Sequence, residues 1–184
     1  MGMVDTEFTD GVQILRINTP PLNTITLQTL SQLRAAIRHA RASSSVNAIV
    51  IAGDTRHFSA GADIQLFRQV ATTGDAVQLC EVFQRTFQDI EDCHKPVVAA
   101  LKGRVIGGAL ELAMACHFRV ASHNARMGLP EVSLGVIPGY GGTQRLPQLI
   151  GKGRAMELIM TAGMIDVDRA LGYGLVNHVV SQEL

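Results

Sequence analysis

The chain has 184 residues, of which 47% are hydrophobic and 17% are charged. This composition supplies enough apolar side chains for a folded core and excludes an intrinsically disordered chain. Lys plus Arg and Asp plus Glu number 16 each, so no net positive charge favours nucleic acid or an anionic membrane as a partner.

Hydrophobic periodicity and turn residues predict an alternation of strands and helices. In the first half of the chain, the patterns predict a strand at 12–20, a helix at 27–43, a strand at 47–53 and a turn at 57–64. A loop or loose helix that includes 72–75 follows this turn, and then a helix at 76–93 and a strand at 95–103. The second half is predicted to contain a helix at 107–116, a strand at 118–122, a loop at 127–147 that runs into a helix at 141–151, helices at 153–163 and 166–174, and a strand at 175–181. Apolar strands alternating with helices indicate an α/β layered architecture. At this length we expect one domain over residues 1–184.

The three cysteines, Cys80, Cys93 and Cys116, are widely spaced and odd in number. They predict reduced thiols in a cytosolic type of compartment. The N-terminal segment lacks the basic stretch and apolar run of a secretory signal, and no apolar run reaches the ~18 residues of a membrane span. We therefore expect a cytoplasmic protein.

A single carboxylate, Glu111, stands in the apolar helical segment at 107–116. One interpretation is that the helix is half-buried and Glu111 faces water. The other is that Glu111 is buried and functional, because a buried carboxylate needs partners or a raised pKa. No charged residue lies one helical turn away to serve as a partner. The residues alone leave both interpretations open.

A second carboxylate, Glu131, follows a proline in the glycine-rich segment 128–142. On its own it is most simply a solvated loop residue, although loops on a rigid scaffold often carry catalytic side chains. Two carboxylates in apolar settings are the usual components of an acid/base pair. Together, Glu111 and Glu131 are therefore candidates for acid/base catalysis.

Two glycine-containing stretches, FSAGAD and RVIGGA, could expose backbone N–H groups to a ligand. The second stretch precedes a predicted helix, whose N-terminus favours negative charge. Two such amides aimed at one point would form an oxyanion hole. Tight packing or turn geometry explains most glycines equally well.

Other types of site find no support in the sequence. No GxSxG motif, HExxH spacing, GxGxxG motif or GxxxxGK[ST] motif occurs. These absences argue against a serine nucleophile, a metal site and the common nucleotide-binding loops. We expect no metal and no cofactor.

Three blocks, HFSAGADI, KPVVAALKGRVIGGALELAMACHFRVAS and ARMGLPEVSLGVIPGYGGTQRLPQLIGK, make the chain resemble the crotonase, or enoyl-CoA hydratase/isomerase, superfamily from about residue 7 onward. The resemblance implies a layered β-β-α spiral with a largely parallel buried sheet flanked by helices. Family hydratases use two glutamates twenty residues apart, and this spacing falls on Glu111 and Glu131. Retaining both glutamates favours hydration over isomerisation.

The same resemblance implies further site residues. It places the oxyanion-hole amides at Ala62 and Gly108. It places coenzyme A, as part of the substrate, along the segment Ala60, Asp63 and Ile64, and the acyl pocket beside Gly139. One departure is Ala109, where the family usually carries a third glycine.

The implied activity is hydration of a trans-2-enoyl-CoA to the 3-hydroxyacyl-CoA in fatty-acid β-oxidation. The alternatives are an enoyl-CoA isomerase and a non-catalytic acyl-CoA-binding protein. Family members continue through C-terminal helices beyond the point where this sequence stops, and those helices complete trimer packing. We accordingly expect a trimer or a dimer of trimers, weakened if those helices are missing.

Overall fold

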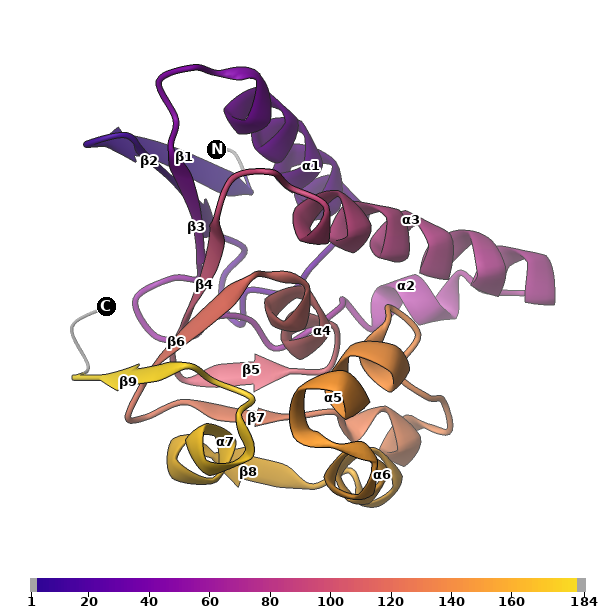
Figure 1. Cartoon of the computed structure of the whole chain (residues 1–184). Helices are drawn as coiled ribbons and strands as arrows, with labels where there is room; N and C mark the ends of the chain where they lie inside the picture. The colour runs from indigo at the N-terminus through magenta and orange to yellow at the C-terminus, as the bar shows by residue number, and fades with distance from the viewer. Residues whose placement is uncertain (1–2, 182–184) are drawn as a thin grey trace.

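The computed structural model describes residues 3–181, and its main sheet has six strands (Figure 1). The strands follow the order β1-β2-β3-β4-β6-β9. They are β1 (Val4–Thr9), β2 (Val12–Ile17), β3 (Ala48–Ala52), β4 (Val97–Leu101), β6 (Phe118–Ser122) and β9 (His178–Val180). Only the β1–β2 hairpin is antiparallel, and every other neighbouring pair is parallel. The expected largely parallel α/β sheet is confirmed.

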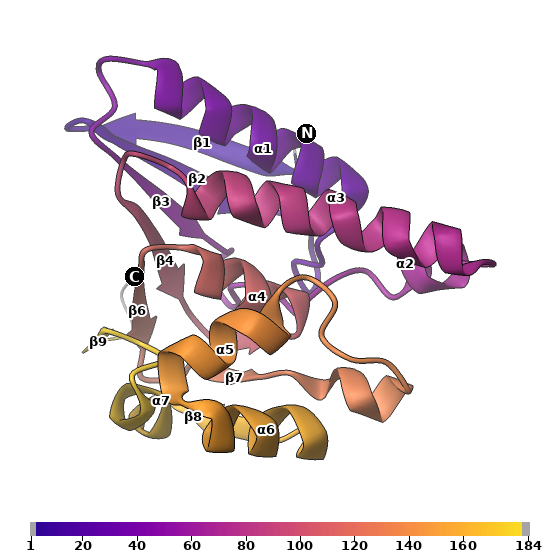
Figure 2. The same cartoon turned by 45° about the vertical axis from the view of Figure 1, so that its right-hand side comes forward.

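Two long helices, α1 (Leu27–Ala42) and α3 (Thr73–Glu91), lie side by side against this sheet (Figure 2). Both begin with a capping box, in which a threonine side chain and the residue three positions later satisfy each other's backbone N–H groups. The capping residues are Thr26 and Thr72. The Thr72 cap explains why α3 starts three residues before the predicted position, because Asp75 completes the box.

A second sheet of three short strands lies in the lower half of the molecule as Figure 1 shows it. Its strands are β5 (Arg104–Ile106), β7 (Arg126–Gly128) and β8 (Met164–Asp166), in the order β5-β7-β8. The β5–β7 pair is parallel and the β7–β8 pair is antiparallel. Strands of three residues leave too short a periodic pattern to recognise in the sequence.

Helix α4 (Gly108–Ala115) occupies the centre of the molecule, where α3, α5 and β5 contact it. All eight of its residues are buried. The remaining helical elements are α2 (Gln65–Arg68), a 3₁₀ turn η1 (Pro130–Leu134), α5 (Gly142–Ile150), α6 (Lys152–Thr161) and α7 (Val167–Tyr173). Across residues 3–181, no helix combines the length and apolar character that a membrane crossing requires.

The structure corrects several sequence-based predictions. The N-terminal strand β1 and the second sheet were not predicted, and α2 lies in the segment predicted as a loop or loose helix. The segment predicted as loop at 127–147 contains the end of β7 and the turn η1. The last strand begins at His178 instead of residue 175, because the N–H groups of Leu175 and Val176 donate to the carbonyl of Ala170 at the end of α7.

Candidate active site

A cavity of about 320 Å³ lies where the turn after residue 59, α3, the start of α4 and the segment Pro130–Tyr140 meet. These four regions are distant in sequence and come together through the two sheets and the central helix. The cavity is lined by Ala60, Gly61, Ala62, Ile64, Phe67, Val70, Ala76, Leu79, Cys80, Ile106, Gly107, Gly108, Glu111, Pro130, Glu131, Leu134, Val136, Ile137, Gly139 and Tyr140. Most of this lining is apolar, and Glu111 and Glu131 are its only carboxylates within the described residues.

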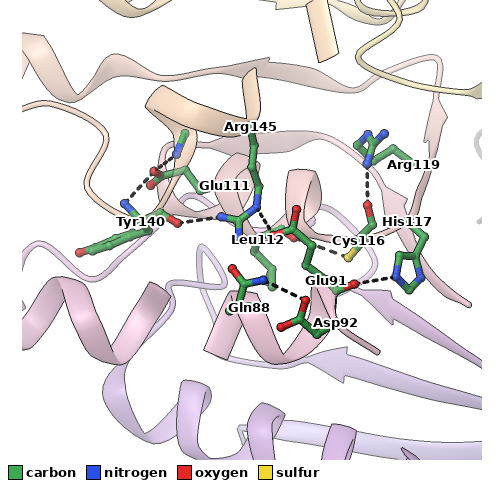
Figure 3. A network of polar contacts seen from close by, with 11 residues as sticks. Gln88, Glu91, Asp92, Glu111, Leu112, Cys116, His117, Arg119, Tyr140 and Arg145 are labelled. Carbon is green, nitrogen blue, oxygen red and sulfur yellow. Dashed lines mark hydrogen bonds and ion pairs between the residues drawn. The ribbon is translucent and has the colours of Figure 1, made fainter. Parts of the chain in front are cut away.

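Glu111 is fully buried, with a side chain 0% exposed. Its Oε1 accepts hydrogen bonds from the backbone N–H groups of Tyr140, at 2.8 Å, and Gly142, at 2.7 Å (Figure 3). These donors lie at the N-terminus of α5, where the helix dipole favours negative charge. The interpretation that Glu111 faces water is therefore wrong.

Burial raises the pKa of Glu111 from its ordinary value of 4.5 to about 7. The two backbone hydrogen bonds and the charge of Arg145 lower this pKa, and the charge of Glu131 raises it. Desolvation outweighs the hydrogen bonds, so the carboxyl group exchanges a proton near neutral pH. A group with such a pKa suits proton transfer at neutral pH.

Glu131 reaches the cavity from η1 and is half-buried. Burial raises the pKa of its carboxyl group above the ordinary value. Its Oε1 lies against Gly107, where a Cβ would come within 2.8 Å of that oxygen. Gly107 also has a φ of 57°, a left-handed conformation that favours glycine. Gly107 thus provides the space that brings Glu131 beside the start of α4.

Three buried side-chain oxygens in residues 3–181 have no hydrogen-bond partner. They are Oε2 of Glu111, Oε2 of Glu131 and Oη of Tyr140. All three residues line the same cavity. Since buried polar groups are nearly always paired, three unpaired oxygens in one place point to a ligand-binding site.

The backbone amides of Ala62 and Gly108 approach each other at the N-terminus of α4. A Cβ on Gly108 would lie 3.5 Å from the Ala62 nitrogen, and a Cβ on Gly61 would lie 3.6 Å from the Gly108 nitrogen. Within residues 3–181, neither N–H is a donor in the backbone hydrogen bonds of the surrounding turns. Two unpaired N–H groups this close can share one acceptor oxygen.

Seven of the eight residues predicted for the site line the cavity. They are Ala60, Ala62, Ile64, Gly108, Glu111, Glu131 and Gly139. Asp63 does not line it: its Oδ1 accepts from the N–H of Gln65, and its own N–H donates to Ile25. Asp63 therefore organises the start of α2, and the structure gives it no direct place in the cavity.

Among the lining residues that sequence reasoning missed, Cys80 and Tyr140 are the two that carry a thiol or a hydroxyl group. Tyr140 stacks on Phe83, with ring centroids 3.8 Å apart and planes 7° from parallel. Its position inside a glycine-rich loop is the one signal that could have identified it, because a large aromatic residue between glycines needs a packing partner. Cys80 lies on α3 with its Sγ next to Gly139, and only the fold brings the two together.

In the part of the chain that the structure describes, no group of three or more His, Cys, Asp or Glu side chains could hold a metal ion.

Comparison with known proteins identifies relatives of this chain. The family model for enoyl-CoA hydratase/isomerase matches residues 7–184. A probable enoyl-CoA hydratase of Bacillus subtilis is 43% identical over 166 residues, which cover 90% of this chain and 64% of that protein. A peroxisomal fatty acid β-oxidation multifunctional protein of Arabidopsis thaliana is 45% identical over 93% of this chain and 24% of its own length.

The chain therefore spans about a quarter of the Arabidopsis relative and less than two thirds of the Bacillus subtilis relative. Among solved structures, an enoyl-CoA hydratase of Bacillus anthracis superimposes with a TM-score of 0.93 at 34% identity, covering 99% of this chain and 71% of that one. Sequence and fold agree, and the chain belongs to the enoyl-CoA hydratase/isomerase, or crotonase, family.

Proposed function

We propose that this chain carries the catalytic core of an enoyl-CoA hydratase, which adds water to a trans-2-enoyl-CoA and forms the 3-hydroxyacyl-CoA. The observation that supports this proposal most strongly is the meeting of two carboxylates, each with an unpaired oxygen, and two unpaired amides at one apolar cavity. The named activities of the relatives support it further.

In this mechanism, the thioester carbonyl oxygen accepts hydrogen bonds from the N–H groups of Ala62 and Gly108. Water adds at C3, and the electrons of the C2=C3 bond move toward the carbonyl, so negative charge develops on that oxygen. Fixed N–H donors stabilise this charge, and removal of one such donor typically costs about 3–4 kcal/mol. The coenzyme A part lies along Ala60 to Ile64, and the acyl group enters the apolar cavity beside Gly139.

Glu111 takes the proton of the attacking water. Its Oε1 is held by two backbone N–H groups, which favour the carboxylate form and leave Oε2 free to accept from water. The water O–H bond breaks as the C3–O bond forms. Glu111 therefore ends the step protonated.

Glu131 gives its proton to C2. Burial raises its pKa, which favours the protonated acid, and no side-chain donor in residues 3–181 stabilises its Oε2. The C2–H bond forms as the Glu131 O–H bond breaks. Proton exchange with solvent then restores both carboxyl groups for the next cycle.

The test is a spectrophotometric assay of the purified chain with crotonyl-CoA, following loss of the conjugated thioester band and confirming the hydrated product by mass. Turnover to 3-hydroxybutanoyl-CoA is the expected result. Conversion of a 3-enoyl-CoA without any hydrated product would indicate an isomerase instead. Binding of the thioester without any turnover would indicate an acyl-CoA-binding protein.

The trimer or dimer of trimers that the family implies stays a prediction. Size-exclusion chromatography with light scattering measures the mass of the assembly directly. A monomer at all concentrations would contradict it.

A further inference from the structure

Among the unpaired buried side-chain oxygens of residues 3–181, only the hydroxyl group of Tyr140 is not used by the proposed hydration. Tyr140 is 4% exposed, and its Oη has no hydrogen-bond partner within residues 3–181. A buried hydroxyl without a partner is unfavourable, whereas a phenylalanine of the same shape carries no such group. The ring explains the packing at this position, but it does not explain the hydroxyl.

The ring of Tyr140 is held rigidly by its surroundings. It stacks on Phe83 and meets the edge of Phe87, with centroids 6.4 Å apart at 86°. Its Cδ2 and Cε2 atoms both come within 3.1 Å of the Cβ position of Gly108. Its backbone is fixed as well, because the N–H donates to Glu111 and the carbonyl accepts from Arg145 (Figure 3). The hydroxyl is therefore fixed in place and cannot turn away to find a partner.

The location of the hydroxyl follows from these contacts. Cε2 is bonded to the ring carbon that carries Oη, so the hydroxyl lies close to Gly108 and the start of α4. Burial raises the pKa of Tyr140, and Cys80, Glu111 and Glu131 raise it further. The group is therefore a protonated hydroxyl at neutral pH, able to donate one hydrogen bond and to accept others.

Three other lining residues carry polar side-chain groups, Glu111, Glu131 and Cys80, but none of them forms a hydrogen bond with this hydroxyl within residues 3–181. The rest of the cavity offers it apolar surface. The wall formed by α2 and α3 is built from Phe67, Ala76 and Leu79, and the facing loop contributes Val136 and Ile137. An acyl chain of carbon and hydrogen alone would fill this space and leave the hydroxyl unpaired. An acyl chain with an oxygen at the right place would pair it.

We propose that the hydroxyl of Tyr140 is a specificity determinant that favours acyl-CoA substrates carrying a hydroxyl or carbonyl oxygen on the acyl chain beyond the reacting C2 and C3 atoms. This inference rests on the proposed function, since it assumes that the acyl group of a CoA thioester occupies the cavity. A site with a buried polar group discriminates strongly against a ligand that leaves the group unpaired.

The test is equilibrium binding, by calorimetry, of saturated thioesters that cannot be hydrated. The probes are butanoyl-CoA with 4-hydroxybutanoyl-CoA, and pentanoyl-CoA with 5-hydroxypentanoyl-CoA. The variant is Tyr140→Phe, which keeps the ring. The matched control is Tyr173→Phe, which removes a phenol hydroxyl from α7, where it accepts from Arg169 and does not line the cavity.

In the unsubstituted chain, we expect the hydroxylated thioester of at least one pair to bind more tightly than its apolar counterpart. Tyr140→Phe should weaken binding of that hydroxylated thioester and strengthen binding of the apolar one, so that the ratio of the two dissociation constants changes about tenfold. Tyr173→Phe should leave the ratio unchanged. A structural role of Tyr140 would move both affinities in the same direction.

Equal changes in both affinities, or no change in either pair, would overturn the inference. This readout is independent of catalysis. A chain that shows the binding preference without hydrating crotonyl-CoA would refute the proposed function alone. A chain that hydrates crotonyl-CoA while Tyr140→Phe leaves both ratios unaltered would refute the specificity role alone.

Discussion

Glu111 and Glu131 reach one cavity from two different kinds of support. Glu111 stands on α4, a helix whose eight residues are all buried, and two N–H groups of the α5 N-terminus hold its Oε1. Glu131 stands on η1, a short turn with no buried residue. The core positions the carboxylate of Glu111, whereas the carboxylate of Glu131 extends from a short turn and rests against Gly107. Changes in the core should therefore affect stability and chemistry together, and changes in the turn should affect chemistry more.

The largest difference in stability is expected between alanine variants of two leucines, one on α4 and one on η1. Leu110 on α4 is 0% exposed, whereas Leu134 at the end of η1 is 63% exposed. Leu110→Ala should lower the free energy of unfolding by about 2–5 kcal/mol because it leaves a cavity in the core. Leu134→Ala should change it by less than about 0.5 kcal/mol. Urea unfolding measures both, and equal losses would contradict the comparison.

The next largest difference should appear in the pH dependence of stability, to which Glu111 should contribute more than Glu131. The folded pKa of Glu111 is raised from 4.5 to about 7, so the folded state holds this proton more tightly than the unfolded state. The stability that the protonated group provides is complete below pH 4.5 and is lost as the pH rises through about 7. Glu111→Gln keeps a neutral side chain, so its stability relative to the unsubstituted chain should rise by about 3 kcal/mol across this range.

Unfolding by urea at a series of pH values from 4.5 to 8 checks this prediction. Glu131→Gln is the matched variant on the turn, and its relative stability should rise less, because Glu131 is only half-buried. A flat difference between Glu111→Gln and the unsubstituted chain would show that the burial of Glu111 does not raise its pKa.

Two glycines with positive φ offer a smaller, sharper comparison. Gly107 has a φ of 57° and touches Glu131, whereas Gly135 has a φ of 75° and open space where a Cβ would lie. Through the backbone alone, alanine should cost about 1–2 kcal/mol of stability at Gly135, which is left-handed helical. It should cost about 1–3 kcal/mol at Gly107, where ψ is −128°. Only Gly107→Ala displaces Glu131, so we expect it to lower kcat/KM for crotonyl-CoA at least tenfold further than Gly135→Ala does. Equal activities of the two variants would contradict the prediction that Gly107 positions Glu131.

The smallest expected effect concerns Arg145, whose charge lowers the pKa of Glu111. Arg145→Gln should shift the acid limb of the kcat/KM profile to slightly higher pH, because Glu111 then loses its proton less readily. Arg85→Gln removes a guanidinium from an exposed ion pair on α3 and serves as the control. A shift to lower pH, or the same shift in both variants, would contradict this role.

Most strands of the main sheet and the long helices could be predicted from the sequence, because their hydrophobic patterns are long. The strands β5, β7 and β8 could not be predicted, because three residues are too few to show the alternating hydrophobic pattern of a strand. These strands nevertheless help to place the start of α4. The burial of Glu111 was also undecided in the sequence. Its partners are backbone N–H groups 29 and 31 residues away, and no side-chain pattern records them.

The family resemblance predicted eight site residues, and all of them except Asp63 line the cavity. Tyr140 was missed because its significance depends on Phe83 and Gly108, which only the fold brings against its ring. The roles of the site residues remain predictions that mutagenesis has to test.

The most direct test of the central claim is a double-mutant cycle on the two carboxylates. The measurement is kcat/KM for crotonyl-CoA with the unsubstituted chain, Glu111→Gln, Glu131→Gln and the double variant, with butanoyl-CoA binding as a check that the cavity remains intact. The account predicts that each single variant loses at least about 100-fold, and that the double variant loses little more than the worse single one, because the pair acts as a unit. Near-normal turnover in either single variant with an intact cavity would contradict it.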